Sequence, residues 1–318
     1  MNAVKLTGLD GSSPLAFLAA LGALRILDER ARHAGGDIPR LAWADEGCWI
    51  PSLLGSASID DVIGAILEDL PRWRDEPAFC FAYNRDGERV LPDAPGAIRD
   101  LKPDPKVMRA FLDEIALAAS RGASRSARHG AAYGTDVATD NSGKTKPSAL
   151  HFTAGNQTFL GAVAEIHDRV TPEDFHEALV GPWSRSSPLK TLGWDPMGAF
   201  NARMYALRAS NPSKENRPCV PGAEWLAFVG LSFFPTVPCR AEVLTTCVSG
   251  GWKDAALTWP LWTVAATVRT IESLLRTATL EHTDSKQRSA RGIGAVLCSA
   301  ILRSDQGGYG SFSPPRMC

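Results

Sequence analysis

An apolar stretch near the amino terminus places the strongest limit on the fold. Residues 14–24 contain no charged side chain, and the first charge after them is Arg25. Pro14 is suited to the first turn of a helix, and a helix that is apolar on all sides must be covered by protein on all sides. We therefore expect a helix over 14–32 whose start lies deep in the core. Four small side chains would let another backbone approach it closely: Ala19, Ala20, Gly22 and Ala23.

Other segments alternate between strand and helix patterns. Residues 41–43 and 48–50 are typical of paired strands around a turn at 45–47, and helices are predicted over 58–70 and 104–119. These segments follow no repeating strand–helix–strand order, and the chain has no internal repeat. The sequence therefore predicts an α+β fold of mixed helices and short antiparallel sheets, built as one domain over residues 1–318.

Composition excludes several classes of protein. The chain is 44% hydrophobic and 22% charged, which is typical of a globular protein and not of a disordered one. It contains no run of roughly 18 uncharged apolar residues, so we expect no transmembrane helix and no membrane partner. The seven cysteines include no closely spaced pair of the kind that holds zinc. We expect a cytoplasmic protein with no metal and no other cofactor.

Basic side chains gather in two segments that are rich in small residues. The first segment, 121–147, has no hydrophobic periodicity and is predicted to be a flexible basic loop or link. The second lies at 286–291. Cations on flexible chain can reach phosphate groups, and each neutralised phosphate releases a counterion. The alternative is a solvated loop that charge keeps soluble. The candidate nucleic-acid-binding residues are Arg121, Arg125, Arg128, Lys144, Lys146, Lys286, Arg288 and Arg291.

The two ends of the chain differ in charge. Residues 1–100 hold 10 basic and 16 acidic side chains, whereas residues 101–318 hold 24 and 19. An acidic N-terminal third could face a basic protein neighbour while the remainder contacts a polyanion. Ordinary scatter of charge is the alternative explanation.

No catalytic motif stands out. Ser142-Gly143-Lys144-Thr145 resembles the end of a phosphate-binding loop, but Ala138 occupies the position where that loop needs a glycine. The chain contains neither a metalloprotease-type histidine pair nor a nucleophile elbow. We therefore predict no catalytic residues and a protein that is not an enzyme.

The opening residues resemble a known family. Gly11-Ser12-Ser13-Pro14-Leu15 followed by Leu21-Gly22-Ala23-Leu24-Arg25 looks like the amino terminus of CRISPR-associated proteins of subtype I-G systems (formerly I-U), in which a tryptophan-bearing strand follows, here with Trp43 and Trp49. Less specific similarities lie at 152–157, 224–227 and 259–262. The resemblance implies a large-subunit-like or helicase-associated component of a type I interference complex, without catalytic residues of its own.

Such a component binds the other subunits of the guide complex, helps to contact target DNA, and helps to recruit the helicase-nuclease. The resemblance thus implies guide RNA, target DNA and these proteins as partners, and it carries over no residue-level binding motif. Two alternatives remain open: a metal-dependent nuclease that uses scattered Asp, Glu and His residues, and a scaffold that contacts protein only.

Overall fold

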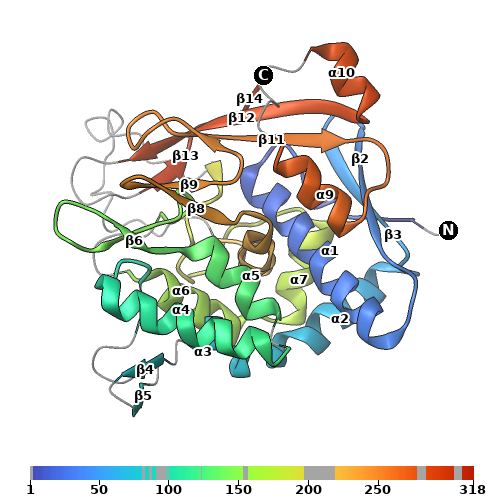
Figure 1. The fold of residues 1–318 in the computed structure, drawn as a ribbon. Helices are drawn as coiled ribbons and strands as arrows, with labels where there is room; N and C mark the ends of the chain where they lie inside the picture. Colours follow the sequence, from blue (N-terminus) through green and yellow to red (C-terminus); the bar gives the residue numbers. More distant parts are fainter. Residues whose placement is uncertain are drawn as a thin grey trace, which may run out of the picture.

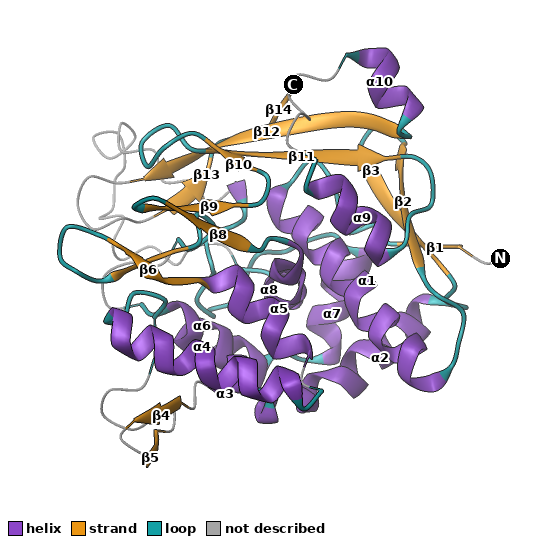
Figure 2. Ribbon diagram, in the orientation of Figure 1, coloured by secondary structure: helices purple, strands orange, loops and turns teal. Residues whose placement is uncertain are grey.

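The computed structural model describes residues 3–80, 83–85, 88–90, 98, 100–122, 124–152, 157–196, 219–277, 284–303 and 310–318. Residues 153–156, within one of the segments that resemble the CRISPR-associated family, lie outside this part of the chain. Most helices lie together in the middle and lower part of Figure 2, with the two larger sheets along its top and right and the β4–β5 hairpin below the helices. The order of elements along the chain mixes helices with short antiparallel sheets, which confirms the predicted α+β fold (Figure 1).

The helices begin and end where local chemistry favours it. Pro14 opens the first helix, and Gly35, with φ of 72°, ends it by donating its N–H to Ala31. At the second helix the Ser58 hydroxyl accepts a hydrogen bond from the Asp61 amide at 3.1 Å. The helices, including the 3-10 helices η1 and η5, are α1 (Pro14–Ala34), α2 (Ile59–Asp69), η1 (Leu70–Asp75), α3 (Pro77–Cys80), α4 (Pro105–Ser120), α5 (Ser124–Tyr133), α6 (Phe159–Arg169), α7 (Pro172–Val180), α8 (Pro221–Gly230), η5 (Leu231–Phe233), α9 (Val268–Leu275) and α10 (Ser285–Ala290).

The strands form antiparallel sheets. One sheet has the order β1-β3-β2, a second has the order β10-β11-β12-β13 with β14 also paired to β12, and three hairpins pair β4 with β5, β6 with β7, and β8 with β9. The strands are β1 (Ala3–Lys5), β2 (Arg40–Asp45), β3 (Trp49–Leu54), β4 (Tyr83–Arg85), β5 (Glu88–Val90), β6 (Gly134–Thr139), β7 (Thr145–Pro147), β8 (Thr236–Cys239), β9 (Glu242–Thr245), β10 (Val248–Ser249), β11 (Ala256–Trp262), β12 (Ile293–Arg303), β13 (Gly310–Phe312) and β14 (Arg316–Met317).

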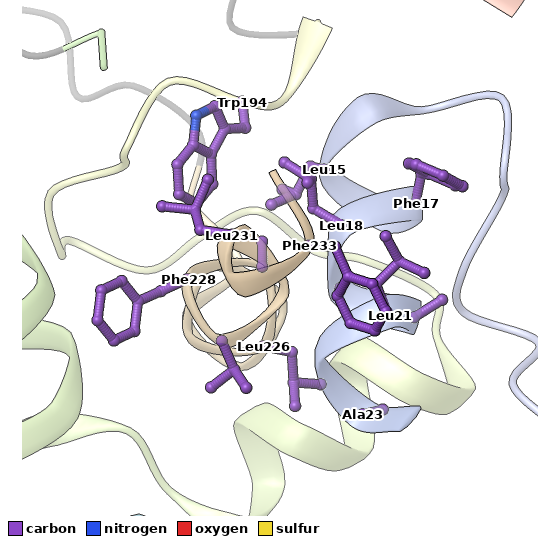
Figure 3. Close-up of a cluster of buried hydrophobic side chains, with 14 of the residues drawn as sticks. Leu15, Phe17, Leu18, Leu21, Ala23, Trp194, Leu226, Phe228, Leu231 and Phe233 are labelled. Carbon is purple, nitrogen blue, oxygen red and sulfur yellow. The ribbon is translucent and has the colours of Figure 1, made fainter. Parts of the chain in front are cut away.

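The apolar helix α1 is buried on two opposite sides. On one side Leu15 and Leu18 face α8 and η5 (Figure 3). On the other side the Phe17 ring lies 5.9 to 6.2 Å, centroid to centroid, from three tryptophans of the sheets, Trp43, Trp259 and Trp262. This double burial is the arrangement that the uninterrupted apolar sequence predicts.

The two helices α1 and α8 cross with their backbones in contact. A Cβ atom added to Gly22 would collide with the carbonyl oxygen of Leu226, and one added to Gly230 would collide with the carbonyl oxygen of Leu18. Only glycine lacks a Cβ, so these two positions allow the close approach that the small residues of α1 predict. The crossing joins the start of the chain to its last third.

The segment 121–147 is not the flexible loop that the sequence predicts. Residues Ser124–Tyr133 form α5, and residues 134–147 form the β6–β7 hairpin. The buried side of α5 consists largely of polar or small residues, among them Arg125, Ser126, His129 and Gly130. A search for apolar residues at helical spacing misses such a helix, because its buried stripe is not apolar.

The segment that resembles a phosphate-binding loop is the turn of this hairpin. An Asp140 carboxylate oxygen accepts hydrogen bonds from the Ser142 amide at 2.8 Å and the Lys144 amide at 3.1 Å, and Gly143 has φ of 78°. Strand β7 follows the turn, where a phosphate-binding loop needs a helix.

In the part of the chain that the structure describes, no helix has the length and hydropathy to cross a membrane.

Candidate functional site

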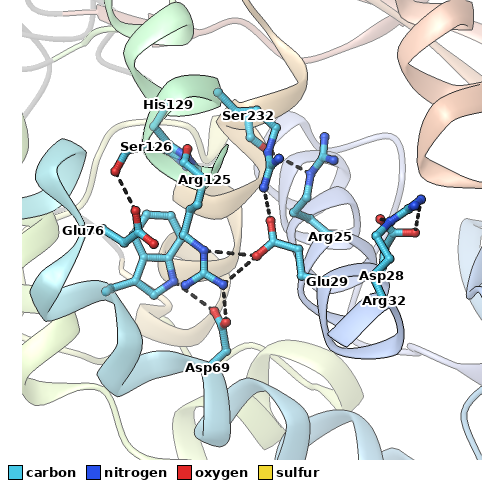
Figure 4. A network of polar contacts seen from close by, with 12 residues as sticks. Arg25, Asp28, Glu29, Arg32, Asp69, Glu76, Arg125, Ser126, His129 and Ser232 are labelled. Carbon is cyan, nitrogen blue, oxygen red and sulfur yellow. Dashed lines mark hydrogen bonds and ion pairs between the residues drawn. The ribbon is translucent and has the colours of Figure 1, made fainter. Parts of the chain in front are cut away.

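Two of the predicted basic residues, Arg125 and Arg128, lie one turn apart on α5 and pair with acids of the N-terminal region. Figure 4 shows Arg125 pointing towards Glu29 and Asp69. The Arg125 Nη2 atom lies 2.6 Å from a carboxylate oxygen of Glu29 on α1 and 2.5 Å from one of Asp69 on α2. Its guanidinium also stacks 4.7 Å from the ring centroid of Trp73. Arg125 is only 8% exposed, so it is a structural cation and not a mobile surface group.

Two neighbouring arginines, Arg128 and Arg25, also pair with acids. Arg128 pairs with the second carboxylate oxygen of Glu29. Arg25, the last residue of the opening motif, donates to Glu272 on α9 at 2.6 Å and to the Ser232 hydroxyl at 3.2 Å. Ion pairs therefore tie α1, α2 and α5 together (Figure 4), and the Arg25–Glu272 pair adds α9.

Burial and charge act in opposite directions on the two carboxylates. Burial would raise the pKa of Glu29, but attraction to Arg125 and Arg128 outweighs it, and the pKa is lowered. At Asp69 burial outweighs attraction to Arg125, and the pKa is raised. The surroundings therefore stabilise the ionised form of Glu29, whereas they destabilise the ionised form of Asp69.

These pairs bear on the charge difference between the two ends of the chain. The sequence suggested that the acids of the N-terminal third could face a basic neighbouring protein, with scatter of charge as the alternative. Glu29 and Asp69 instead pair within the chain, both with Arg125, which lies 96 and 56 residues further along. Part of the charge difference between the two ends of the chain is therefore complementary and internal.

A cleft of about 610 Å³ opens above this network. Its lining includes Arg25 and Arg32 of α1 together with Arg125 and Arg128 of α5. Three further arginines complete the rim: Arg72 of η1, Arg269 of α9 and Arg276 directly after α9. We call the set of seven arginines around this cavity the arginine cleft.

The three rim arginines differ from the others in being exposed and unpaired. Arg72, Arg269 and Arg276 make no ion pair with any residue in the described ranges, whereas Arg32 pairs with Asp28 at 2.7 Å. An exposed guanidinium without an acid partner is free to bind an anion through up to five N–H donors. The rim is therefore the part of the cleft that can take up a ligand without breaking an internal contact.

The hairpin lysines of the first predicted segment lie outside the cleft. Lys144 pairs with Asp104 at 2.9 Å, and Lys146 pairs with Glu242 at 2.7 Å. Arg121 is exposed directly after α4 and is not among the cleft residues. The basic residues of this segment therefore do not form one surface.

The second predicted segment is also separate. Lys286 and Arg291 are exposed on and directly after α10, and Arg288 donates to the carbonyl oxygen of Cys318 at 2.6 Å. Arg288 lines a different cavity, of about 390 Å³, which shares no lining residue with the arginine cleft. The structure thus brings Arg125 and Arg128 into one site and leaves the other six predicted residues outside it.

Sequence reasoning missed five of the seven cleft arginines. A usable signal exists for four of them: Arg25 and Arg32 are seven residues apart, and so are Arg269 and Arg276. Seven residues are two turns of a helix, so each pair must share a helix face. Nothing in the sequence shows that these two faces and Arg72 meet.

Within the described residues, no group of three or more His, Cys, Asp or Glu side chains is placed to hold a metal ion. Comparison of the chain with protein-family models, with curated proteins and with solved structures found no match.

Proposed function

We propose that this chain is a non-catalytic subunit of a type I CRISPR interference complex, and that it contacts nucleic acid through the arginine cleft. The observation that carries the proposal is the convergence of seven arginines on one cavity, three of which are exposed and make no ion pair with the residues that the structure describes. Guanidinium groups bind phosphate through planar, charge-assisted pairs of hydrogen bonds, which makes phosphate the natural ligand of such a rim. The opening motif supports the wider assignment, since its last residue, Arg25, lines the same cleft.

The proposal differs from the sequence-based one in which residues it uses. Arg125 and Arg128 act as the charged floor, held in place by Glu29, and the rim arginines make the contacts. The hairpin lysines and the α10 cluster are not required. The proposed partners are the same: guide RNA, target DNA, other subunits of the complex and its helicase-nuclease.

The test uses fluorescence anisotropy with labelled single-stranded RNA and DNA. The triple variant R72E/R269E/R276E should lose most of its affinity, and its plot of log K against log salt should be shallower by about 2, because single strands give a slope of about −0.7 per neutralised phosphate. The control K106E/K190E/K253E changes the net charge equally at exposed lysines outside the cleft. Equal losses in both variants, or no loss in either, would overturn the proposal.

Two further measurements separate the alternatives. Labelled DNA incubated with the protein and Mg²⁺ or Mn²⁺ should stay intact, and cleavage that a chelator abolishes would favour the nuclease. RNA that copurifies with the tagged chain from its own host should contain CRISPR guide sequences. If no guide RNA copurifies and the protein binds neither labelled RNA nor labelled DNA at any salt concentration, the result would favour the protein-only scaffold.

A further inference from the structure

The size of the arginine cleft limits what can enter it. A cavity of about 610 Å³ falls in the range of sites that hold one small molecule. Its walls come from α1, η1, α5 and α9, and its floor is the ion-pair network around Glu29. Such a cavity admits one or two nucleotides of a single strand and not the body of a duplex.

The charge of the lining limits the ligand further. Seven arginines face five carboxylates, those of Asp28, Glu29, Glu76 and Glu272 in the lining and that of Asp69, which pairs with Arg125, and this leaves two positive charges in excess. An internal phosphodiester carries one negative charge, whereas a terminal phosphate monoester carries about two and presents three acceptor oxygens. A terminal phosphate monoester by itself therefore matches this excess, whereas one internal phosphodiester does not.

The rim supplies donors in the number that such a group needs. Arg72, Arg269 and Arg276 border the same cavity, and none is held by a carboxylate within the described residues. Three unpaired guanidinium groups suit the three oxygens of one terminal phosphate. A strand that ends in a hydroxyl group would leave part of this excess charge without a partner.

We infer that the arginine cleft is an end-binding site, which captures the terminal phosphate of a single-stranded nucleic acid. The inference rests on the proposed function, since it specifies which part of the nucleic acid the same cleft recognises. Bound in this way, the strand would be anchored at one end while the rest of it leaves the cleft towards other subunits.

The experiment compares three oligonucleotides of one sequence, each 12 nucleotides long and labelled on an internal base: one with a 5′-phosphate, one with a 3′-phosphate, and one with hydroxyl groups at both ends. The full-length protein should bind one phosphorylated form at least tenfold more tightly than the unphosphorylated one. In the variant R72Q/R269Q/R276Q this preference should disappear. The control K106Q/K190Q/K253Q should keep it, and thermal unfolding should show that both variants are folded.

Competition identifies the source of the phosphate. A mononucleotide should displace the phosphorylated strand, whereas inorganic phosphate should need a far higher concentration. Displacement by inorganic phosphate at the concentration of the mononucleotide would overturn recognition of a nucleic-acid end. Equal affinity for all three oligonucleotides, lost in the rim variant, would overturn the inference and leave the proposed function in place. Failure of every oligonucleotide to bind would overturn both.

Discussion

Replacement of Gly22 by alanine tests the close crossing of α1 and α8. The added Cβ would overlap the carbonyl oxygen of Leu226, and it would also lie 2.7 Å from that carbonyl carbon and 3.1 Å from the amide nitrogen of Gly230. All three atoms belong to the backbone, so no side-chain rotation can relieve the contact. The two helices must move apart, although both are buried along their facing sides.

The expected magnitude follows from two opposing effects. Overpacking of a core costs about 1–3 kcal/mol, and the upper end applies here because backbone must move. Alanine is better than glycine in a helix by about 1 kcal/mol, which offsets part of this cost. We therefore expect G22A to lower the free energy of unfolding by about 2 kcal/mol or more.

A matched control exists in α2. A Cβ added to Gly64 would meet nothing within 4 Å, so G64A should raise the free energy of unfolding by about 1 kcal/mol through helix propensity alone. Urea unfolding followed by tryptophan fluorescence measures both variants, because Trp43, Trp225 and Trp259 are buried. A G22A protein as stable as the parent, or a G64A protein that loses as much as G22A, would refute the reasoning.

Three further predictions concern the network and one helix cap. R125M removes the cation that pairs with the buried carboxylates of Asp69 and Glu29, and it should lower the free energy of unfolding by about 3–5 kcal/mol in urea unfolding. R121M, at an exposed position, should change this free energy by less than about 0.5 kcal/mol. Similar values for the two variants would contradict the buried ion pairs. Burial lowers the pKa of His129 to about 4, below the value of about 6.5 in the unfolded chain. Between these two values the unfolded chain binds more protons than the folded one, so the free energy of unfolding should fall as pH drops from 6.5 to 4. H129Q should flatten this dependence, and an unchanged pH profile would show that another group causes it. T171A removes the hydroxyl that accepts from the Asp174 amide and should cost about 1 kcal/mol, whereas an unaltered urea midpoint would mean that the cap of α7 is not stabilising.

Local pattern predicts much of this fold. The uncharged run from Pro14 to Leu24 correctly places α1 in the core, and the strands around the turn at 45–47 pair as expected. Helix α5 escapes prediction because its buried stripe is made of polar and small residues such as Arg125 and Ser126, and their burial depends on Glu29 and Glu76 supplied by other elements. Periodicity detects apolar stripes, and it does not detect polar ones that distant partners neutralise.

The candidate site is less predictable than the fold. The sequence indicates Arg125 and Arg128 as cations, but it cannot show that Glu29 pairs with both of them. The exposed rim depends on Arg72 and on residues about 200 positions later, Arg269 and Arg276. Residues so far apart are brought together by tertiary packing alone, and their spacing in the sequence carries no trace of it.

The crossing of α1 with α8 has a consequence for how the protein is made. During translation α1 emerges early, and its partner follows about 200 residues later. Ribosomes add about 5–20 residues per second, so the apolar segment of α1 is exposed without its packing partner α8 for roughly 10–40 s. A nascent chain in that interval is a natural client for chaperones, and a fragment that stops before Pro221 should come out of recombinant cells as inclusion bodies.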